Sequence, residues 1–220
     1  MWKEMIAVAL LYAVPLLLAV VVHEVSHGYI AEKRGDPTAR LLGRITLNPF
    51  VHIDLIGTIL LPVALIAMRS PFLFGWAKPV PVNFSNLRGG RRDMALVSAA
   101  GPLSNLLLAC LSAAVYHLIL SEYAAPGSQG TSQFAWIAEP LQRMAGISVE
   151  FNLVLMVINL LPVPPLDGGR ILVGLLPLGL AVQLEKLERY GMLIVLLFII
   201  SDFWSYIVRP VLNLFVNLLL

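Results

Sequence analysis

The sequence predicts an all-α polytopic membrane protein: a bundle of four to six transmembrane helices with a short membrane-associated β-strand or hairpin and a re-entrant segment. Composition indicates a membrane protein, because 59% of the residues are hydrophobic and 13% are charged, with a mean hydropathy of +0.85. About a quarter of the residues of an ordinary soluble domain are charged. Four apolar segments are long enough to cross a bilayer, which takes about 20 helical residues: Met5–Ile30, Met94–Ser121, Ile147–Leu166 and Tyr190–Ile207.

Basic residues gather in two stretches that flank another apolar segment, Ile53–Met68. Ala31–His52 contains four Lys or Arg residues, and Arg69–Asp93 contains five. Loops rich in Lys and Arg remain on the cytoplasmic side of a membrane, so Ile53–Met68 is expected to enter and leave on that side as a re-entrant or interfacial element. Glu122–Gly146 has few basic residues and is expected outside. This topology accounts for the net charge of +2, and we expect no nucleic-acid partner.

The segment Gly75–Val82, with the sequence GWAKPVPV, is expected to be extended. Proline excludes a helix interior and suits an edge strand, so this is the predicted β-strand or hairpin. Non-helical backbone at membrane depth needs protein or water around it. An exposed strand edge at such a place can accept a peptide as an added strand.

No repeat and no soluble accessory domain are evident. We expect one membrane-embedded domain over residues 1–220, with its core at about 5–172 and C-terminal helices at 173–220. Whether residues 53–68 and 209–220 span the membrane or only enter it stays open, as does the oligomeric state.

The motif HEVSH, residues 23–27, lies at the end of the first apolar segment. On a helix, His23 and His27 lie four residues apart on one face, so both can bind one metal ion. Glu24 can reach a water molecule at that ion, which is the arrangement of a zinc protease. The alternative is a pair of ordinary core histidines near the membrane interface.

A second motif, NLLPVPPLDGG at residues 159–169, ends the third apolar segment. The first and third spans are predicted to be parallel, which brings the carboxylate of Asp167 to the depth of the two histidines. Catalytic zinc takes three protein ligands and one open position, and His23, His27 and Asp167 meet that need. Prolines end the helix before Asp167, and Gly168 and Gly169 allow positive φ and close backbone approach. The alternative is a helix C-terminus with ordinary stop signals, which leaves an aspartate at membrane depth unexplained.

Three further residues are candidates for substrate contact. Asn159 lies two helical turns before Asp167, and a structural helix–helix contact is its equal alternative. His52 lies at the start of the re-entrant segment, where a polar interface turn is the alternative. Asn105 belongs to a small polar face with Gly101 and Ser104, for which simple helix packing is the favoured interpretation.

The two motifs together resemble the site-2 protease family of intramembrane zinc metalloproteases. The stretches LNPFVHIDLIGT, GWAKPVPVN and AAGPLSN resemble its compact prokaryotic branch, and the resemblance covers roughly residues 15–172. It implies one zinc ion held by His23, His27 and Asp167, with Glu24 as general base. It also implies hydrolysis of peptide bonds in or near transmembrane segments, the reaction of regulated intramembrane proteolysis. In contrast to better-known relatives, no PDZ domain is evident.

The expected partners are therefore a transmembrane protein or peptide substrate and the lipid bilayer. The resemblance places the chain in a prokaryotic cell membrane, and the basic loops place its site toward the cytoplasm. Two alternatives are a membrane metal-binding or transport protein and a non-catalytic scaffold of protease ancestry. Transport needs polar residues along a path across the bilayer, whereas the ligands here gather at one depth. The presence of Glu24 argues against a scaffold.

Overall fold

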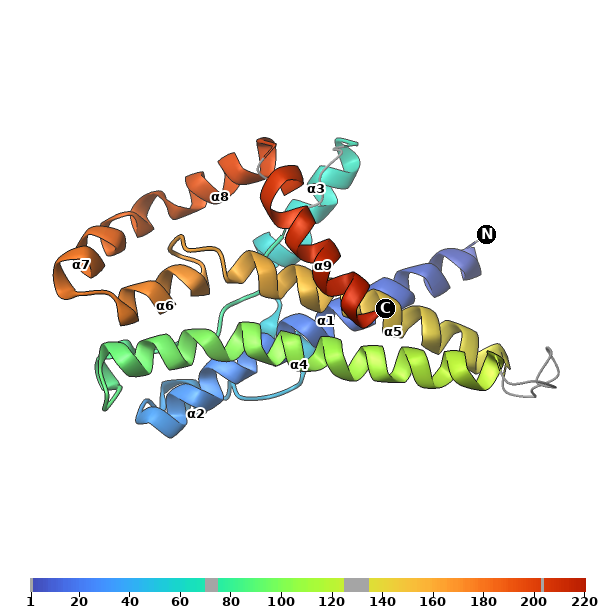
Figure 1. The fold of residues 1–220 in the computed structure, drawn as a ribbon, viewed down its shortest axis with the longest axis horizontal. Helices are drawn as coiled ribbons and strands as arrows, with labels where there is room; N and C mark the ends of the chain where they lie inside the picture. Colours follow the sequence, from blue (N-terminus) through green and yellow to red (C-terminus); the bar gives the residue numbers. More distant parts are fainter. Residues whose placement is uncertain (1, 70–74, 125–134, 203) are drawn as a thin grey trace.

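Three long helices run side by side along the molecule: α1 (Trp2–Arg34), α4 (Arg91–Ala124) and α5 (Ala135–Asn159) (Figure 1). The computed structural model describes residues 2–69, 75–124, 135–202 and 204–220. Each long helix includes a stretch apolar and long enough to span a membrane, and these stretches are Leu10–Arg34, Arg91–Ser121 and Trp136–Asn159. Helices α1 and α5 start from the same end, and α4 runs in the opposite direction (Figure 1). The first and third spans are therefore parallel, as predicted.

Shorter elements connect and cover this bundle. After α1 come α2 (Thr38–Leu41), the turn η1 (Pro49–His52), the π-helical η2 (Leu55–Leu60) and α3 (Leu61–Ala67), and the turn η3 (Phe84–Asn86) precedes α4. After α5 the chain forms α6 (Asp167–Leu175), α7 (Leu178–Lys186), η4 (Glu188–Tyr190), α8 (Gly191–Ile200), η5 (Trp204–Val208) and α9 (Arg209–Leu219). Helices α6 and α7 lie at the end of the bundle opposite the N-terminus (Figure 1).

Two of the four predicted spans differ in the structure. The third begins at Trp136 and ends at Asn159, because Pro162, Pro164 and Pro165 cannot continue the helix. The fourth is broken: α8 ends at Ile200 after ten residues, and Ser201 is extended. A fourth to sixth span is therefore not confirmed among the described residues. The element formed by η2 and α3 is apolar but shorter than a span, and its predicted re-entry stays a prediction.

The predicted β-strand or hairpin is not confirmed either, because no strand occurs in the part of the chain that the structure describes. Residues 75–83 carry no helix and follow an irregular course. A strand requires a partner strand, and Pro79 and Pro81 offer no backbone N–H group for one.

Small and aliphatic side chains form the core between the long helices. Ala109 and Ala113 lie one turn apart on α4 and pack on Val149 and Leu153 of α5. Small residues at this spacing allow two helix backbones to approach closely. Helix α9 covers this core with one face, on which lie Leu212, Phe215, Val216 and Leu219.

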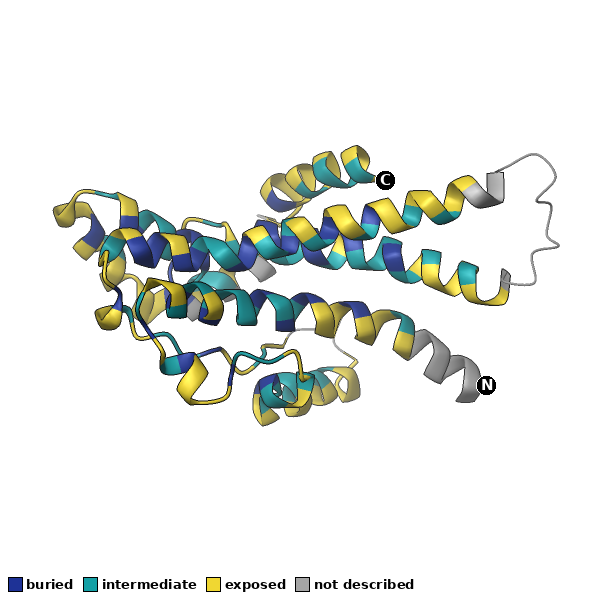
Figure 2. Cartoon of the chain, turned by 90° about the horizontal axis from the view of Figure 1, so that it is seen from below, coloured by how far each residue is buried: buried dark blue, intermediate teal, exposed yellow. Residues whose placement is uncertain are grey.

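The outer faces of the long helices are exposed (Figure 2), and they carry many large apolar side chains. On α4 they include Leu103, Leu107, Leu111 and Leu118, each more than half exposed. Water would oppose an apolar stripe of this length, whereas lipid tails accept it. Together with the three candidate spans, this surface is that of an integral membrane protein.

Candidate metal centre

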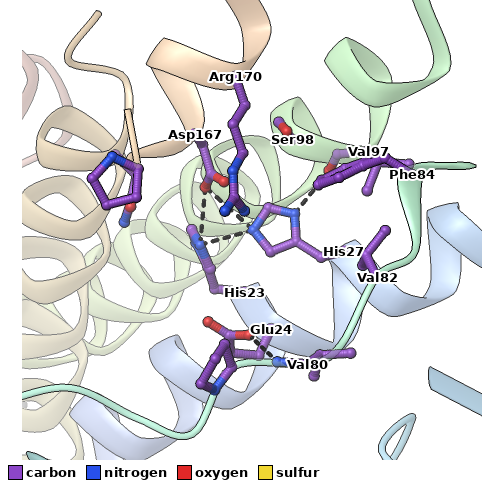
Figure 3. A pocket seen from close by; sticks show the side chains of 13 residues that line it. His23, Glu24, His27, Val80, Val82, Phe84, Val97, Ser98, Asp167 and Arg170 are labelled. Atoms are coloured by element: carbon purple, nitrogen blue, oxygen red, sulfur yellow. Dashed lines mark hydrogen bonds and ion pairs between the residues drawn. The ribbon is translucent and has the colours of Figure 1, made fainter. Parts of the chain in front are cut away.

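Three side chains from two distant helices meet at one point. His23 and His27 project from the same face of α1, with their Nε2 atoms 3.1 Å apart. Asp167, the first residue of α6, places its Oδ2 atom 3.2 Å from each of these nitrogens (Figure 3). The predicted convergence of residues that lie 140 positions apart in sequence therefore occurs within one triangle of ligand atoms.

Asp167 reaches this position because the chain turns sharply between α5 and α6. The turn is so tight that two glycines are required just after the aspartate. A Cβ atom on Gly168 would lie 2.3 Å from the carbonyl oxygen of Leu160, and one on Gly169 would lie 2.2 Å from the nitrogen of Pro164. The predicted close approach is present, without the positive φ that glycine allows, because both glycines are helical residues of α6.

Hydrogen bonds assign the lone pairs of both imidazoles. His27 Nδ1 lies 2.8 Å from the carbonyl oxygen of Val97, which can only accept, so Nδ1 carries the proton and Nε2 presents a lone pair. His23 Nδ1 lies 2.6 Å from Oδ1 of Asn105, another acceptor, so Nδ1 of His23 also carries the proton and its Nε2 presents a lone pair. Three acceptor atoms therefore point at one another.

This arrangement fits a zinc ion. Asp167 Oδ2 is buried and has no hydrogen-bond partner, and only a cation or added protons would relieve the repulsion between it and the two nitrogens. Zinc bonds of about 2.0–2.1 Å in a tetrahedral site separate the ligand atoms by about 3.3–3.4 Å, close to the distances found here. Burial raises the pKa of Asp167, which lies outside the candidate spans, but protons on the facing imidazole nitrogens, the alternative to a cation, lower it to about 2. The carboxylate is therefore charged at neutral pH.

Helix α4 passes so close to the imidazoles that only glycine fits. A Cβ atom on Gly101 would lie 2.5 Å from Nε2 of His27 and 2.6 Å from Nε2 of His23. The sequence favoured simple helix packing for this position. The structure shows that α4 packs directly against the candidate ligand atoms.

The three ligands and Glu24 line a cavity of about 400 Å³. Glu24 lies on α1 beside His23, and its Oε2 atom accepts a hydrogen bond of 2.7 Å from the backbone N–H of Val80 (Figure 3). The irregular segment that was predicted as a strand thus forms one wall, with Pro79, Val80, Val82 and Phe84 lining the cavity.

Two buried charged residues hold this wall segment, defined as residues 78–86. Arg44 donates from Nη2 to the carbonyl oxygens of Lys78, at 2.8 Å, and Pro79, at 3.3 Å. Asp36 accepts from the backbone N–H of Asn83 at 2.7 Å and from the side chain of Asn86 at 2.8 Å. Burial raises the pKa of Asp36, but hydrogen bonds from Thr38, Asn86 and Asn83 lower it below its usual value.

The other predicted candidates have different positions. Asn159 lines the cavity, and its amide donates to the carbonyl oxygen of Leu155 at 2.9 Å. His52 does not line the cavity: it is 2% exposed, and its ring is bonded to the carbonyl oxygen of Thr46. Asn105 is 0% exposed and lies behind His23, so its polar atoms are taken up by protein. Neither His52 nor Asn105 lines this cavity, and their contact with a substrate stays a prediction.

Sequence reasoning missed Arg44, Asp36 and Arg170. Arg170 lines the cavity and bonds to Glu188 at 3.2 Å, with its guanidinium 5.5 Å from the ring centre of Phe84. One signal was available for it, because a residue three positions after Asp167 on a helix lies on the same face. Arg44 and Asp36 lie in the basic stretch Ala31–His52, which was predicted to be cytoplasmic, and there charge alone does not distinguish a buried side chain from a solvated one.

The fold and the site together define a class: a membrane-embedded protein with the H-E-x-x-H helix of a zinc metalloprotease and a third, carboxylate ligand from a distant helix. The profile of Peptidase family M50 matches residues 11–201. This chain belongs to that family, the site-2 protease family. The family assignment agrees with the resemblance carried by the two motifs.

Individual relatives support the assignment. YwhC of Bacillus subtilis, named provisionally as a zinc metalloprotease, is 39% identical over 200 residues that cover 91% of this chain and 84% of YwhC. Rip2 of Mycolicibacterium smegmatis and Rip2 of Mycobacterium tuberculosis, named in the same way, are 27% and 32% identical. These matches cover 84% and 69% of this chain, but only 64% and 52% of the two relatives. No solved structure matches the chain significantly.

Proposed function

We propose that this chain is an intramembrane zinc endopeptidase that hydrolyses peptide bonds in or near transmembrane segments of membrane proteins. The observation that carries the proposal is the triangle of three acceptor atoms, 3.1–3.2 Å apart, beside a glutamate in one cavity. His23, His27 and Asp167 would hold one zinc ion per chain. Bound zinc supplies Lewis acidity, which polarises a peptide carbonyl and brings the pKa of water to about 7.

Glu24 is the proposed general base. Its bond to Val80 N–H holds the carboxylate in the cavity through one oxygen, Oε2. The second oxygen is not engaged by that bond, and so can take a proton from the attacking water and pass it to the leaving amine. The amide of Asn159 has a second N–H beyond the one given to Leu155, and we assign it to the substrate backbone.

The setting of the site supports a substrate within the membrane. The candidate ligands lie toward the C-terminal ends of α1 and α5, and the exposed faces of the same helices are apolar. The basic stretches at residues 31–52 and 69–93 favour a cytoplasmic orientation of this end. We place the protein in a prokaryotic cell membrane on the strength of its bacterial relatives, with regulated intramembrane proteolysis as its process.

The test is the substitution Glu24→Gln in the purified full-length chain, reconstituted in liposomes. The probes are peptides with a single transmembrane segment, carrying a fluorophore and a quencher on either side of it. We expect zinc to be retained and cleavage to fall by at least about 100-fold, since an amide cannot act as a base. Glu32→Gln on the same helix is the matched control, because Glu32 pairs with Arg40 away from the cavity.

Cleavage by Glu24→Gln at the unsubstituted rate would contradict the proposed mechanism. The metal-transport alternative would be favoured by a different result. In that case the unsubstituted chain binds zinc and cleaves none of the probes, and zinc crosses the liposome membrane at a measurable rate.

A further inference from the structure

A line of buried polar side chains leads away from the candidate metal centre through the middle of the bundle. Asn105 of α4 joins His23 of α1 to Asn152 of α5. Its Oδ1 lies 2.6 Å from Nδ1 of His23, and its Nδ2 donates to Oδ1 of Asn152 at 2.9 Å. Asn105 is 0% exposed and Asn152 is 1% exposed. Polar groups buried at this depth are costly unless they are paired, and the proposed reaction uses neither amide.

Backbone carbonyl groups determine which way round each amide lies. Nδ2 of Asn105 donates to the carbonyl oxygen of Ala19 on α1 at 3.1 Å. Nδ2 of Asn152 donates to the carbonyl oxygen of Ser148, one turn earlier on α5, at 2.8 Å. A carbonyl oxygen can only accept, so the atom facing it must be the amide nitrogen in both residues. Each Oδ1 is thereby directed to its neighbour: Asn152 toward Asn105, and Asn105 toward His23.

The orientation of Asn105 decides which nitrogen of His23 is free for a metal ion. With Oδ1 facing the ring, His23 Nδ1 must carry the proton, and Nε2 presents its lone pair to the other two ligands. If the Asn105 amide turned over, its NH₂ group would face Nδ1, and the proton would move to Nε2. Its oxygen would then face Oδ1 of Asn152 and the carbonyl oxygen of Ala19, two acceptors, which opposes that rotation.

We propose that Asn152 is a positioning residue for the zinc site: through Asn105, it keeps His23 in the tautomer that can bind the ion. Asn152 touches neither ligand nor cavity, and it acts from the third helix of the bundle. This inference rests on the proposed function in one respect, the role of His23 as a zinc ligand. It assigns to α5 a further contribution to the site, in addition to Asn159 and to the turn that leads to Asp167.

The experiment measures the zinc affinity of the full-length chain in detergent by competition with a zinc-binding dye. For Asn152→Leu, which has similar volume and no polar atom, we expect zinc binding to weaken by about 10–100-fold, the usual effect of removing a partner behind a ligand. Asn152→Asp retains an oxygen that can accept from Asn105, and should restore most of the affinity. Val149→Ala, a buried substitution one turn away on α5, is the control for a general loosening of the helix and should leave the affinity unchanged.

Two further measurements separate a positioning role from a merely structural one. If Asn152 acts through Asn105, the double variant Asn105→Leu, Asn152→Leu should bind zinc no more weakly than Asn105→Leu alone. In the zinc-free protein, ¹⁵N NMR of the four histidines should show His23 with its proton on Nδ1, and a second tautomer should emerge in Asn152→Leu.

Equal zinc affinity of Asn152→Leu and the unsubstituted chain, or additive losses in the double variant, would overturn the inference while leaving the proposed function intact. Failure of the unsubstituted chain to bind zinc stoichiometrically would overturn both. Loss of affinity in Val149→Ala to the same extent as in Asn152→Leu would show a loosened helix, and would also overturn the positioning role.

Discussion

Gly101 illustrates how one absent side chain shapes the candidate metal centre. It lies on α4, and the atoms closest to its missing Cβ are ring atoms of His27 and His23, including both Nε2 atoms that face the proposed ion. In the middle of a helix, glycine costs roughly 0.5–1 kcal/mol relative to alanine. Glycine is needed here despite that cost, because any side chain at position 101 would hold α4 further from the imidazoles.

We expect Gly101→Ala to weaken zinc binding by at least about 10-fold, although the substitution favours the helix, because the methyl group must displace one or both rings. Dye competition in detergent measures the affinity. Gly146→Ala is the matched control: its Cβ would lie 3.6 Å from the ring of Tyr116, an ordinary contact, so that variant should bind zinc normally. Unchanged affinity in Gly101→Ala would mean that α4 yields without disturbing the ligands.

Single residues also show what was predictable. Short local motifs with a recognisable spacing of metal-binding residues were sufficient to select His23, Glu24, His27 and Asp167. His52 and Asn105 could not be placed, because polar residues in apolar surroundings satisfy one another across the fold. Asn105 bonds to partners 82, 86 and 47 positions away, and such pairings have no local signature.

At the scale of elements, the wall segment 78–86 shows how an irregular stretch of chain becomes a defined part of a site. Its backbone is bonded by Glu24, Arg44 and Asp36, all from the chain before it. Alternating Pro and Val residues predicted that Gly75–Val82 would not be helical, which is correct. They did not predict that side chains would replace the missing partner strand, since those side chains lie 34–56 positions away.

We expect Arg44→Met to reduce the kcat/KM for peptide cleavage by roughly 10-fold or more while zinc content is unchanged. The substitution removes two hydrogen bonds from a charged donor, each contributing about 1.5–3 kcal/mol, and so frees the wall segment without touching the ligands. Arg40→Met is the control, because Arg40 is exposed and its ion pair with Glu32 lies in solvent, where such pairs contribute little to stability. Loss of zinc from Arg44→Met would assign Arg44 to the metal site instead.

Helix ends were the least accurate part of the prediction at this scale. Apolar runs predicted where helices form, but the third span was extended through Leu166 although the helix ends at Asn159. The fourth apolar run was counted as one span, whereas Ser201 and Asp202 interrupt it. Hydropathy averages over such interruptions, because one or two polar residues hardly change the mean of a long window.

For the molecule as a whole, the convergence of the site follows from the direction of three helices. Parallel α1 and α5 bring the HEVSH motif and the chain leading to Asp167 to the same end of the bundle (Figure 1). This could be predicted from the apolar segments and the loop charges together, since the two basic stretches exclude a crossing by Ile53–Met68 and leave the first and third spans parallel. The packing of α6, α7 and α9 could not be predicted, because their sequences are compatible with either a lipid or a protein environment.

The same argument predicts the orientation in the membrane. In a Cys110→Ser background, which removes the one native cysteine, we expect Glu139→Cys to react with a membrane-impermeant thiol reagent in intact cells. Arg40→Cys should react only after the membrane is opened, because it lies at the basic end of the bundle. Both native side chains are more than half exposed, so access through the protein does not limit either reaction. The reverse labelling pattern would place the candidate site on the opposite side.

The position of Glu24 restricts the form in which a polypeptide can be attacked. Glu24 and the three acceptor atoms line one cavity, so under the proposed function a scissile carbonyl group has to enter that cavity unpaired. Inside a helix each carbonyl group already accepts a bond from the N–H group four residues later. A segment would therefore have to uncoil first, and its susceptibility would be governed by how readily it uncoils rather than by which side chains it displays.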